Sequence, residues 1–178
     1  FGSSADHKVY AVDLASGRQR WSFFTGGPVR FAPAIEDGRA FVASDDGCLY
    51  CLDASQGTLL WRFQGGPRRE KLLGNGQMTS RWPLRSGVAV EAGVVYFSAG
   101  MWPSEGVYFY ALRADDGAVL WKNDTSGADY LPQPHPPACA VTGVAPQGYL
   151  LGWNDQLFLP TGRNVPAAYD RHTGRRAH

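Results

Sequence analysis

One stretch of the sequence decides the fold because its pattern recurs: Tyr10-Ala-Val-Asp-Leu-Ala-Ser-Gly-Arg-Gln-Arg-Trp21. The pattern returns as Tyr50-Cys-Leu-Asp-Ala-Ser-Gln-Gly-Thr-Leu-Leu-Trp61 and as Tyr110-Ala-Leu-Arg-Ala-Asp-Asp-Gly-Ala-Val-Leu-Trp121. A partial copy, Ala167-Ala-Tyr-Asp-Arg-His-Thr-Gly-Arg-Arg-Ala-His178, keeps the Asp and the Gly but ends on His. The repeated glycines lie 40, 60 and 57 residues apart, at Gly17, Gly57, Gly117 and Gly174. That spacing is typical of propeller blades, each a four-stranded sheet.

Each residue type in the repeat has a physical role. The Asp can accept hydrogen bonds from the backbone of the following turn, and the Gly can adopt a positive φ there. A Trp at one fixed place in every unit indicates that its ring packs against a neighbouring unit. Burying about 200 Å² of indole would contribute at most on the order of 5 kcal/mol. In the third copy Arg113 replaces the Asp, so we expect Asp115 or Asp116 to serve that turn.

Turn signals between the repeats complete the blades. Glu36-Asp37-Gly38 and Asp45-Asp46-Gly47 separate short apolar runs, and Asp-Gly between such runs favours a hairpin. The same reasoning gives strands A to D in each unit. They are predicted at 30–35, 39–44, 47–53 and 58–63; at 86–90, 94–99, 106–112 and 118–122; and at 148–152, 156–161 and 165–170, with the last D strand cut short.

The predicted fold is therefore all-β: one partial propeller domain over residues 1–178, built of four-stranded antiparallel blades. Residues 1–3 read as the tail of a B strand, so the chain is expected to begin and stop within a blade. The blades are predicted at about 1–23 (partial), 30–63, 86–122 and 148–178 (partial).

The composition agrees with a folded β protein. Gly 22 and Pro 12 supply many turns, and 44% hydrophobic residues with a net charge of +1 can bury a core. The scattered, near-neutral charge argues against a nucleic-acid surface, and no apolar run is long enough to span a bilayer. No targeting signal is visible at the start of the sequence.

The three cysteines do not predict a disulfide framework. Cys48 and Cys51 form a C-x-x-C pattern within an expected strand. A separation of three residues in a strand places the two side chains on opposite faces, which fits neither a shared metal nor a mutual disulfide. We expect them to be buried core thiols. Cys139 stands alone in a Pro-rich segment, and its role stays open.

The repeat resembles that of pyrroloquinoline-quinone-type, quinoprotein alcohol-dehydrogenase-like β-propellers. The residues that carry the resemblance are Ala11-x-Asp13-x-x-x-Gly17-x-x-x-Trp21 and its copies, which match the tryptophan-docking motif of that family. Such propellers usually have seven or eight blades, so the resemblance implies about half of one. More narrowly, residues 1–10, 21–33 and 102–106 look like large propeller proteins of planctomycete-type bacteria, whose function is unassigned.

Irregular connections mark the candidate site. The A–B and C–D turns are short, whereas the D–A links 64–85 and 123–147 and the B–C link 100–105 are long, and such loops on a rigid scaffold often carry function. Guanidinium groups on this rim could clamp an anion, aromatic rings could stack on a ligand, and an acid or imidazole could act as a base. The candidates are Arg30, Arg81, Trp82, Arg85, Trp102, Glu105, His135, Gln147 and Arg163. The alternative is structural: arginines pair with carboxylates and tryptophans fill gaps between blades.

Two functions remain open. The first is a non-catalytic, ligand- or protein-binding scaffold within a larger protein, without cofactor or metal, similar to the quinone-free propeller lipoprotein of the outer-membrane β-barrel assembly machinery. The second is a quinoprotein dehydrogenase that uses pyrroloquinoline quinone and Ca²⁺ to oxidise an alcohol or sugar. The resemblance implies that a quinoprotein alcohol dehydrogenase would carry a disulfide between adjacent cysteines and a Glu/Asn/Asp set for calcium. This sequence has no adjacent cysteines, and no such set can be placed on it, which favours the first function. Its expected partners are other blades or domains of the same protein, another protein, or a small anionic ligand. The resemblance favours a periplasmic or other extracytoplasmic location.

Overall fold

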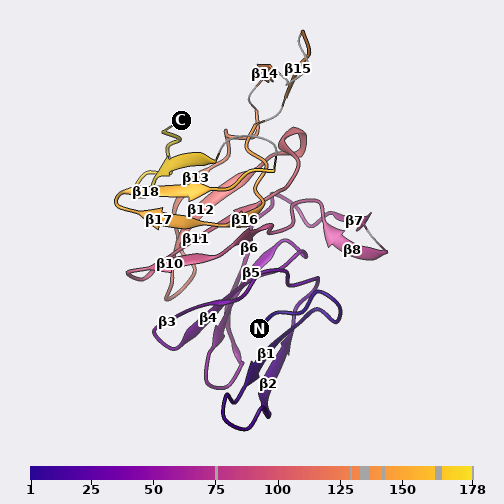
Figure 1. Cartoon of the computed structure of the whole chain (residues 1–178), viewed down its shortest axis with the longest axis vertical. Coiled ribbons are helices and arrows are strands. Elements are labelled where there is room, and N and C mark those ends of the chain that lie inside the picture. The colour runs from indigo at the N-terminus through magenta and orange to yellow at the C-terminus, as the bar shows by residue number, and fades with distance from the viewer. Residues whose placement is uncertain (75, 129, 133–136, 142, 163–165, 178) are drawn as a thin grey trace.

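The fold is a succession of antiparallel β-sheets. The computed structural model describes residues 1–74, 76–128, 130–132, 137–141, 143–162 and 166–177. Apart from one 3₁₀ turn, η1 (Pro103–Glu105), the described elements are all strands. The sheets follow one another from the N-terminus, in indigo, to the C-terminus, in yellow (Figure 1). The all-β propeller prediction is confirmed, and no described helix is long and apolar enough to cross a membrane.

Two complete four-stranded sheets form the middle of the chain. Their strand orders are β3-β4-β5-β6 and β10-β11-β12-β13, so each sheet is a simple meander. The strands of the first are β3 (Ala34–Glu36), β4 (Arg39–Ala43), β5 (Cys48–Asp53) and β6 (Leu59–Gln64). The strands of the second are β10 (Ala89–Glu91), β11 (Val94–Ala99), β12 (Tyr108–Arg113) and β13 (Val119–Asn123).

A smaller sheet flanks each side of this pair. The first contains β1 (Lys8–Val12) and β2 (Gln19–Phe24), and the last contains β17 (Leu151–Trp153), β18 (Gln156–Leu159) and β19 (Ala167–Asp170). An isolated bridge extends each of them: Gly2 pairs with Val9, and Arg176 pairs with Tyr169. These bridges lie where the sequence predicts the tail of a B strand and a shortened D strand.

The predicted A strands differ most from the structure. The strand expected at 30–35 starts only at Ala34, which leaves Arg30 in the preceding loop; Pro33 has no N–H to give to a ladder. The strands expected at 86–90 and 148–152 are each interrupted. Their first parts, β9 (Ser86–Gly87) and β16 (Gly148–Tyr149), pair with each other in parallel rather than within their own sheets. Three other strand limits also differ from the prediction. β12 starts at 108 rather than 106, β18 ends at 159 rather than 161, and β19 starts at 167 rather than 165.

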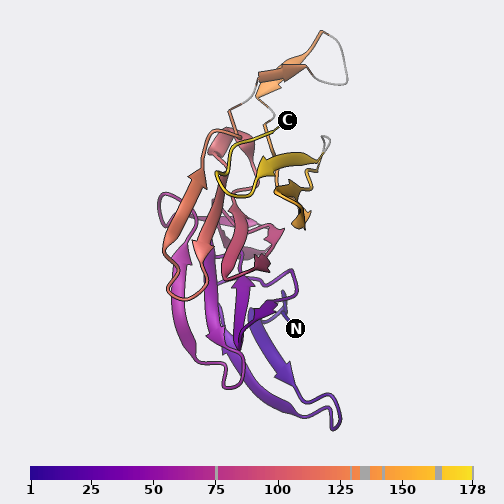
Figure 2. The ribbon, with the colours of Figure 1, turned by 90° about the vertical axis from the view of Figure 1, so that its left-hand side faces the viewer.

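The sequence predicted the two long D–A links as loops, but they contain regular structure. Each contains a hairpin: β7 (Lys71–Gly74) with β8 (Gln77–Ser80), and β14 (Tyr130–Pro132) with β15 (Cys139–Val141). Figure 2 shows the second hairpin projecting beyond the sheets. Asn75-Gly76 in the first link is a strong two-residue hairpin signal, and Gly76 has a φ of 73°. That signal was present in the sequence and was not used.

The repeated tryptophans bridge successive sheets. The Trp61 Nε1 donates a 3.0 Å hydrogen bond to the Ala114 carbonyl of the next repeat. A Cβ added to Gly117 would lie 3.0 Å from the Trp61 ring, so the glycine leaves room for the indole. Two further pairs repeat this arrangement: Trp21 with Gly57, and Trp121 with Gly174.

The Asp of the repeat holds the turn between the two strands of that repeat. The Asp53 Oδ1 accepts hydrogen bonds from the backbone N–H groups of Ser55 (2.8 Å) and Gln56 (2.9 Å). A hydrogen bond from the Ser55 hydroxyl, together with these two, holds the pKa of Asp53 below its usual value. Where Arg113 stands in place of the Asp, Asp116 accepts the turn hydrogen bond from the Ala118 N–H at 3.0 Å.

Buried apolar side chains fill the space between the sheets. Cys51 lies in the cluster between the two complete sheets, whereas Cys48 lies in the cluster on the other face of β5. The two thiols therefore point to opposite sides of one strand. Burial raises the pKa of Cys48 to about 11 and that of Cys51 to about 12, so both stay protonated at neutral pH.

Candidate functional site

Two of the predicted rim arginines meet at a buried carboxylate. Asp45 lies in the turn between β4 and β5, and its side chain is 1% exposed. The Arg30 Nε donates to the Asp45 Oδ2 at 2.7 Å, and the Arg85 Nε lies 2.8 Å from the Asp45 Oδ1. Burial lowers the pKa of Arg85, while the Asp45 charge opposes that shift. This carboxylate neutralises part of the charge that the sequence analysis assigned to ligand binding.

The other described rim arginine is also paired. The Arg81 Nε donates to the Glu105 Oε2 at 2.6 Å, and its Nη1 donates to the Glu70 Oε2 at 3.0 Å. Hydrogen bonds to Glu70 and Glu105 raise the pKa of Arg81. Glu105 belongs to the B–C link of one sheet and Glu70 to the D–A link before it, so Arg81 ties two connections together.

Trp82 is part of the same brace rather than an exposed stacking platform. It is 3% exposed, and its Nε1 donates to the Glu105 carbonyl at 2.7 Å. A Cβ on Gly66 would lie 2.9 Å from Trp82, so Trp82 packs against the start of its own link. Arg30, Arg81 and Arg85 each lie against a carboxylate, of Asp45, Glu70 or Glu105, and Trp82 is buried. A ligand clamp built on these side chains stays a prediction.

The remaining predicted rim residues are dispersed. Trp102 is 54% exposed and precedes η1. Gln147 is exposed; its backbone N–H donates to the Pro160 carbonyl, and its amide lies beside Gly162. His135 and Arg163 lie outside the residues that the structure describes. The structure therefore brings together Arg81, Trp82 and Glu105, and separately Arg30 and Arg85.

An aromatic residue that the sequence analysis did not select links distant sheets. Tyr149 in β16 accepts a 3.1 Å hydrogen bond on its hydroxyl from the Ala32 N–H, and its ring packs edge-on against Phe31 at 5.2 Å. A Cβ on Gly87 would lie 2.3 Å from the same ring. Tyr149 remains 52% exposed. Its role was hidden because its partners are far away in sequence.

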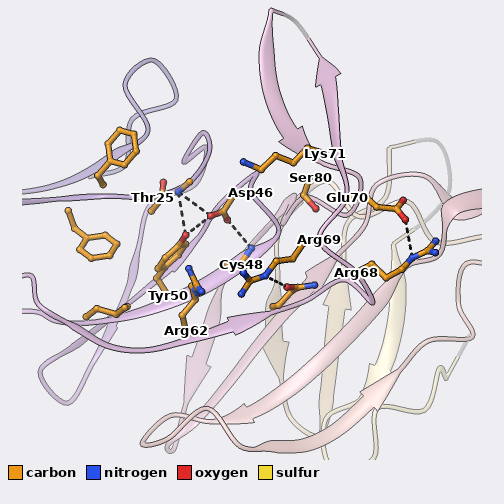
Figure 3. A pocket seen from close by; sticks show the side chains of 15 residues that line it. Thr25, Asp46, Cys48, Tyr50, Arg62, Arg68, Arg69, Glu70, Lys71 and Ser80 are labelled. Atoms are coloured by element: carbon orange, nitrogen blue, oxygen red, sulfur yellow. Dashed lines mark hydrogen bonds and ion pairs between the residues drawn. The ribbon is translucent and has the colours of Figure 1, made fainter.

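A pocket opens between the first two sheets, beside the β7–β8 hairpin. Its volume is about 390 Å³, within the range of small-ligand sites. Its wall combines aromatic side chains of β2 with polar and charged side chains of β5, β6 and the following link (Figure 3). The charged lining residues are Arg62, Arg68, Arg69, Lys71, Asp46 and Glu70.

The two carboxylates of this pocket are engaged. The Asp46 carboxylate accepts hydrogen bonds from the backbone N–H groups of Gly26 (3.1 Å) and Cys48 (2.9 Å) and from the Tyr50 hydroxyl. Burial, with the Asp46 charge, raises the pKa of Tyr50, so this phenol stays neutral. Glu70 pairs with Arg68 at 3.0 Å as well as with Arg81.

Its remaining cations lack acidic partners among the described residues. The Arg69 Nε donates only to the neutral Gln64 Oε1, at 2.9 Å, and no described carboxylate forms an ion pair with Arg62 or Lys71. The sequence analysis missed the pocket because its charges come from three different segments. The basic run Arg68-Arg69 before a hairpin signal was the one usable clue.

The described part of the chain offers no ready metal centre. No three His, Cys, Asp or Glu side chains converge among its residues. The three cysteines are free thiols, and Cys139 is exposed.

Comparison with known proteins agrees with the repeat. Residues 3–81 match the family model described as outer membrane protein assembly factor BamB. The tetrathionate hydrolase of Acidithiobacillus ferrooxidans is 26% identical over 120 residues, which cover 67% of this chain and 20% of that protein. The chain therefore spans about a fifth of that relative.

Solved structures agree on the fold. BamB from Moraxella catarrhalis superposes with a TM-score of 0.68 at 17% identity, covering 99% of this chain and 47% of that one. A quinohemoprotein alcohol dehydrogenase from Pseudomonas putida HK5 gives a TM-score of 0.73 at 16% identity, covering 99% of this chain and 31% of that one. Together with the family match, these likenesses support pyrroloquinoline-quinone-like propeller repeats in this chain.

Proposed function

We propose that this chain is the propeller scaffold of a larger, extracytoplasmic protein and that it binds another protein without a cofactor. The observation that carries the proposal is the β7–β8 hairpin. It presents Leu72, Leu73 and Met78 with exposed fractions of 42%, 75% and 49%. Figure 1 shows this hairpin projecting on the side away from the β3–β4 turn. Exposed apolar groups on a projecting element are typical of protein-contact sites.

The rim of the propeller supports the same proposal. Asp45, Glu70 and Glu105 already pair with Arg30, Arg81 and Arg85, so these three cations brace the connections. The match to a family described as an outer-membrane assembly factor supports both an extracytoplasmic location and a scaffold role. We also propose that the chain is related to the planctomycete-type propeller proteins that residues 1–10, 21–33 and 102–106 resemble.

We favour a protein without quinone and Ca²⁺ on the chemistry of the described residues. The buried carboxylate of Asp45 faces two guanidinium groups rather than an open position, and no three metal-ligating side chains converge in the described ranges. The likeness to quinoprotein dehydrogenases is a likeness of fold, and a fold hosts many functions. A dehydrogenase remains the alternative that the experiment must separate.

The test uses the intact protein that carries this chain, with a photo-crosslinking amino acid at position 73 or at position 14. Leu14 is a matched control, because it is an exposed leucine like Leu73 but lies in a C–D turn on the opposite rim. We expect position 73 to crosslink one protein saturably, Leu73→Ser to weaken that crosslink, and position 14 to give none.

A parallel titration with pyrroloquinoline quinone and Ca²⁺ follows dye reduction with an alcohol or sugar. We expect no turnover. Equal crosslinking at both positions would contradict the hairpin contact, and quinone-dependent turnover would establish the dehydrogenase instead.

A further inference from the structure

We propose that the pocket between the first two sheets binds a small organic oxyanion, a carboxylate or phosphate attached to an aromatic ring. This pocket lies at the outer part of the fold, between strand β2 and strands β5–β6, and it is separate from the apolar tip of the hairpin. The proposal does not depend on the proposed protein-binding function.

The charge balance of the pocket favours an anion. Four cationic side chains line it against two carboxylates, and both carboxylates have their own donors in the protein. Arg62 and Lys71 have no acidic partner in the described ranges, and Arg69 is held only by a neutral amide. A guanidinium that keeps free N–H donors can bind a carboxylate or phosphate through two parallel hydrogen bonds.

The position of these cations makes the charge local. Arg62 comes from β6 and Arg69 from the link that follows it, yet both line the same pocket as Cys48. Two segments therefore direct positive charge toward one wall of the pocket (Figure 3). Lys71 adds a third cation from the base of the hairpin.

The remaining wall favours a ring. Phe23 and Phe24 line the pocket with Leu59, and Phe23 packs edge-on against Tyr50 at 5.6 Å. Aromatic side chains bind flat apolar groups well. A volume of about 390 Å³ accommodates one ring with its acidic substituent.

The floor of the pocket is preorganised. Tyr50 and Gly26 both donate to Asp46, and the hydroxyl of the buried Thr25 donates to the Gly27 carbonyl at 2.7 Å. These hydrogen bonds fix the floor and satisfy its acid. The exposed cations at the mouth of the pocket are thus left to meet a ligand.

The experiment measures binding of three probes to the intact protein by calorimetry: phenyl phosphate, inorganic phosphate and the neutral benzyl alcohol. Benzoate is added as a fourth probe, so that a ring-bound carboxylate can be distinguished from a phosphate. We expect phenyl phosphate or the carboxylate to bind saturably, inorganic phosphate more weakly, and benzyl alcohol weakest.

Variants then test the residues. The double change Arg62→Gln with Lys71→Gln is expected to weaken binding at least tenfold, while Phe24→Ala weakens phenyl phosphate more than inorganic phosphate. Arg18→Gln is the matched control, because Arg18 is exposed but is not part of the pocket lining. This variant should bind phenyl phosphate with unchanged affinity.

Two results would overturn the proposal. One is the absence of saturable binding of either ring-bearing anion at millimolar concentration. The other is an equal loss of affinity in the pocket variant and in Arg18→Gln, which would indicate non-specific attraction by net charge. Because Arg62 and Lys71 are exposed, we expect the double variant to fold. A melting curve like that of the unaltered protein verifies this.

Discussion

Ala92 has a backbone conformation that ordinarily belongs to glycine or asparagine. Its φ is 52°, and the following Gly93 has a φ of 75°, so the pair forms the tight turn between β10 and β11. A left-handed conformation costs most residues roughly 1–2 kcal/mol, and Asn pays less because its side chain can bond locally. The equivalent turns place Asp37 and Asn154 at this conformation.

We therefore expect Ala92→Asn to stabilise the protein by about 0.5–1 kcal/mol, because it removes part of this strain. Equilibrium unfolding in urea measures the change. Gly93→Ala is the opposing control and should destabilise, since it adds strain at the next position. A variant Ala92→Asn that is less stable than the unaltered protein would contradict this account of the turn.

The turn aspartates add a pH dependence at the same scale. Hydrogen bonds from Ser55 and Gln56 lower the pKa of Asp53 from its usual 3.8 in the folded state. A group whose pKa is lowered by folding contributes stability above its unfolded pKa, and that contribution is lost as the pH falls through the folded pKa. The stabilising effect of Asp53 is therefore complete near neutral pH.

We expect Asp53→Asn to lower stability at pH 7 and to flatten the decrease in stability between pH 5 and pH 3. Urea unfolding at those three pH values measures both effects. If the variant lost stability in parallel with the unaltered protein below pH 5, the carboxylate would not be a source of the acid sensitivity.

Single residues were predictable where chemistry is local. The Asp and Gly of each repeat act within a few positions of themselves, so their roles followed from the sequence. The partners of Arg81 were not predictable, because Glu70 lies across the β7–β8 hairpin of the same link and Glu105 lies in a different connection. Chain order alone does not say which charges meet.

At the scale of the element, the four repeat glycines allow the cost of backbone strain to be separated from the cost of a contact with the indole. Their φ values are similar, with 68° at Gly17 and 74° at Gly57, so an added methyl group strains their backbones equally. They differ in their surroundings. A Cβ on Gly57 would lie 2.5 Å from the Trp21 ring, whereas a Cβ on Gly17 would meet nothing within 4 Å.

We expect Gly57→Ala to destabilise the protein more than Gly17→Ala, by about 1–3 kcal/mol, because the methyl group forces the indole out of place. The difference between the two free energies of unfolding isolates the contact from the backbone strain. Equal losses would mean that the indole moves aside without cost.

The strands show where sequence patterns succeed and where they fail. β4, β5, β6 and β11 lie within about a residue of their predicted bounds, since apolar alternation and Asp-Gly turns mark their ends. Two of the A strands failed because their first residues pair between blades, as β9 with β16 does, and the strand expected at 30–35 starts only after Pro33. No pattern within 86–90 indicates that its partner lies at 148–149.

At the scale of the whole molecule, buried and paired side chains of the rim join separate connections. The sequence placed Trp82 and Trp102 together as ligand-stacking candidates, but Trp82 is 3% exposed and Trp102 is 54% exposed. Burial of Trp82 between two connections joins them, and its N–H is satisfied by the Glu105 carbonyl.

We expect Trp82→Ala to destabilise the protein by about 3–5 kcal/mol, as the removal of a buried aromatic side chain does. Trp102→Ala is the matched control and should change stability by less than about 0.5 kcal/mol, because exposed positions tolerate substitution. Thermal or urea unfolding measures both. A small loss for Trp82→Ala would return this residue to the list of ligand-stacking candidates.

The parallel pairing of β9 with β16 has a consequence for how the sheets move. Main-chain hydrogen bonding, including the Gly148 N–H to the Arg85 carbonyl at 3.3 Å, joins two neighbouring blades along one edge. The Ala32 bond to Tyr149 adds a crossing tie from a third. Concerted motion of the sheets should therefore hinge at the β9–β16 pairing. The far edges of the blades should separate first, and the backbone amides of β9 and β16 should exchange with solvent last.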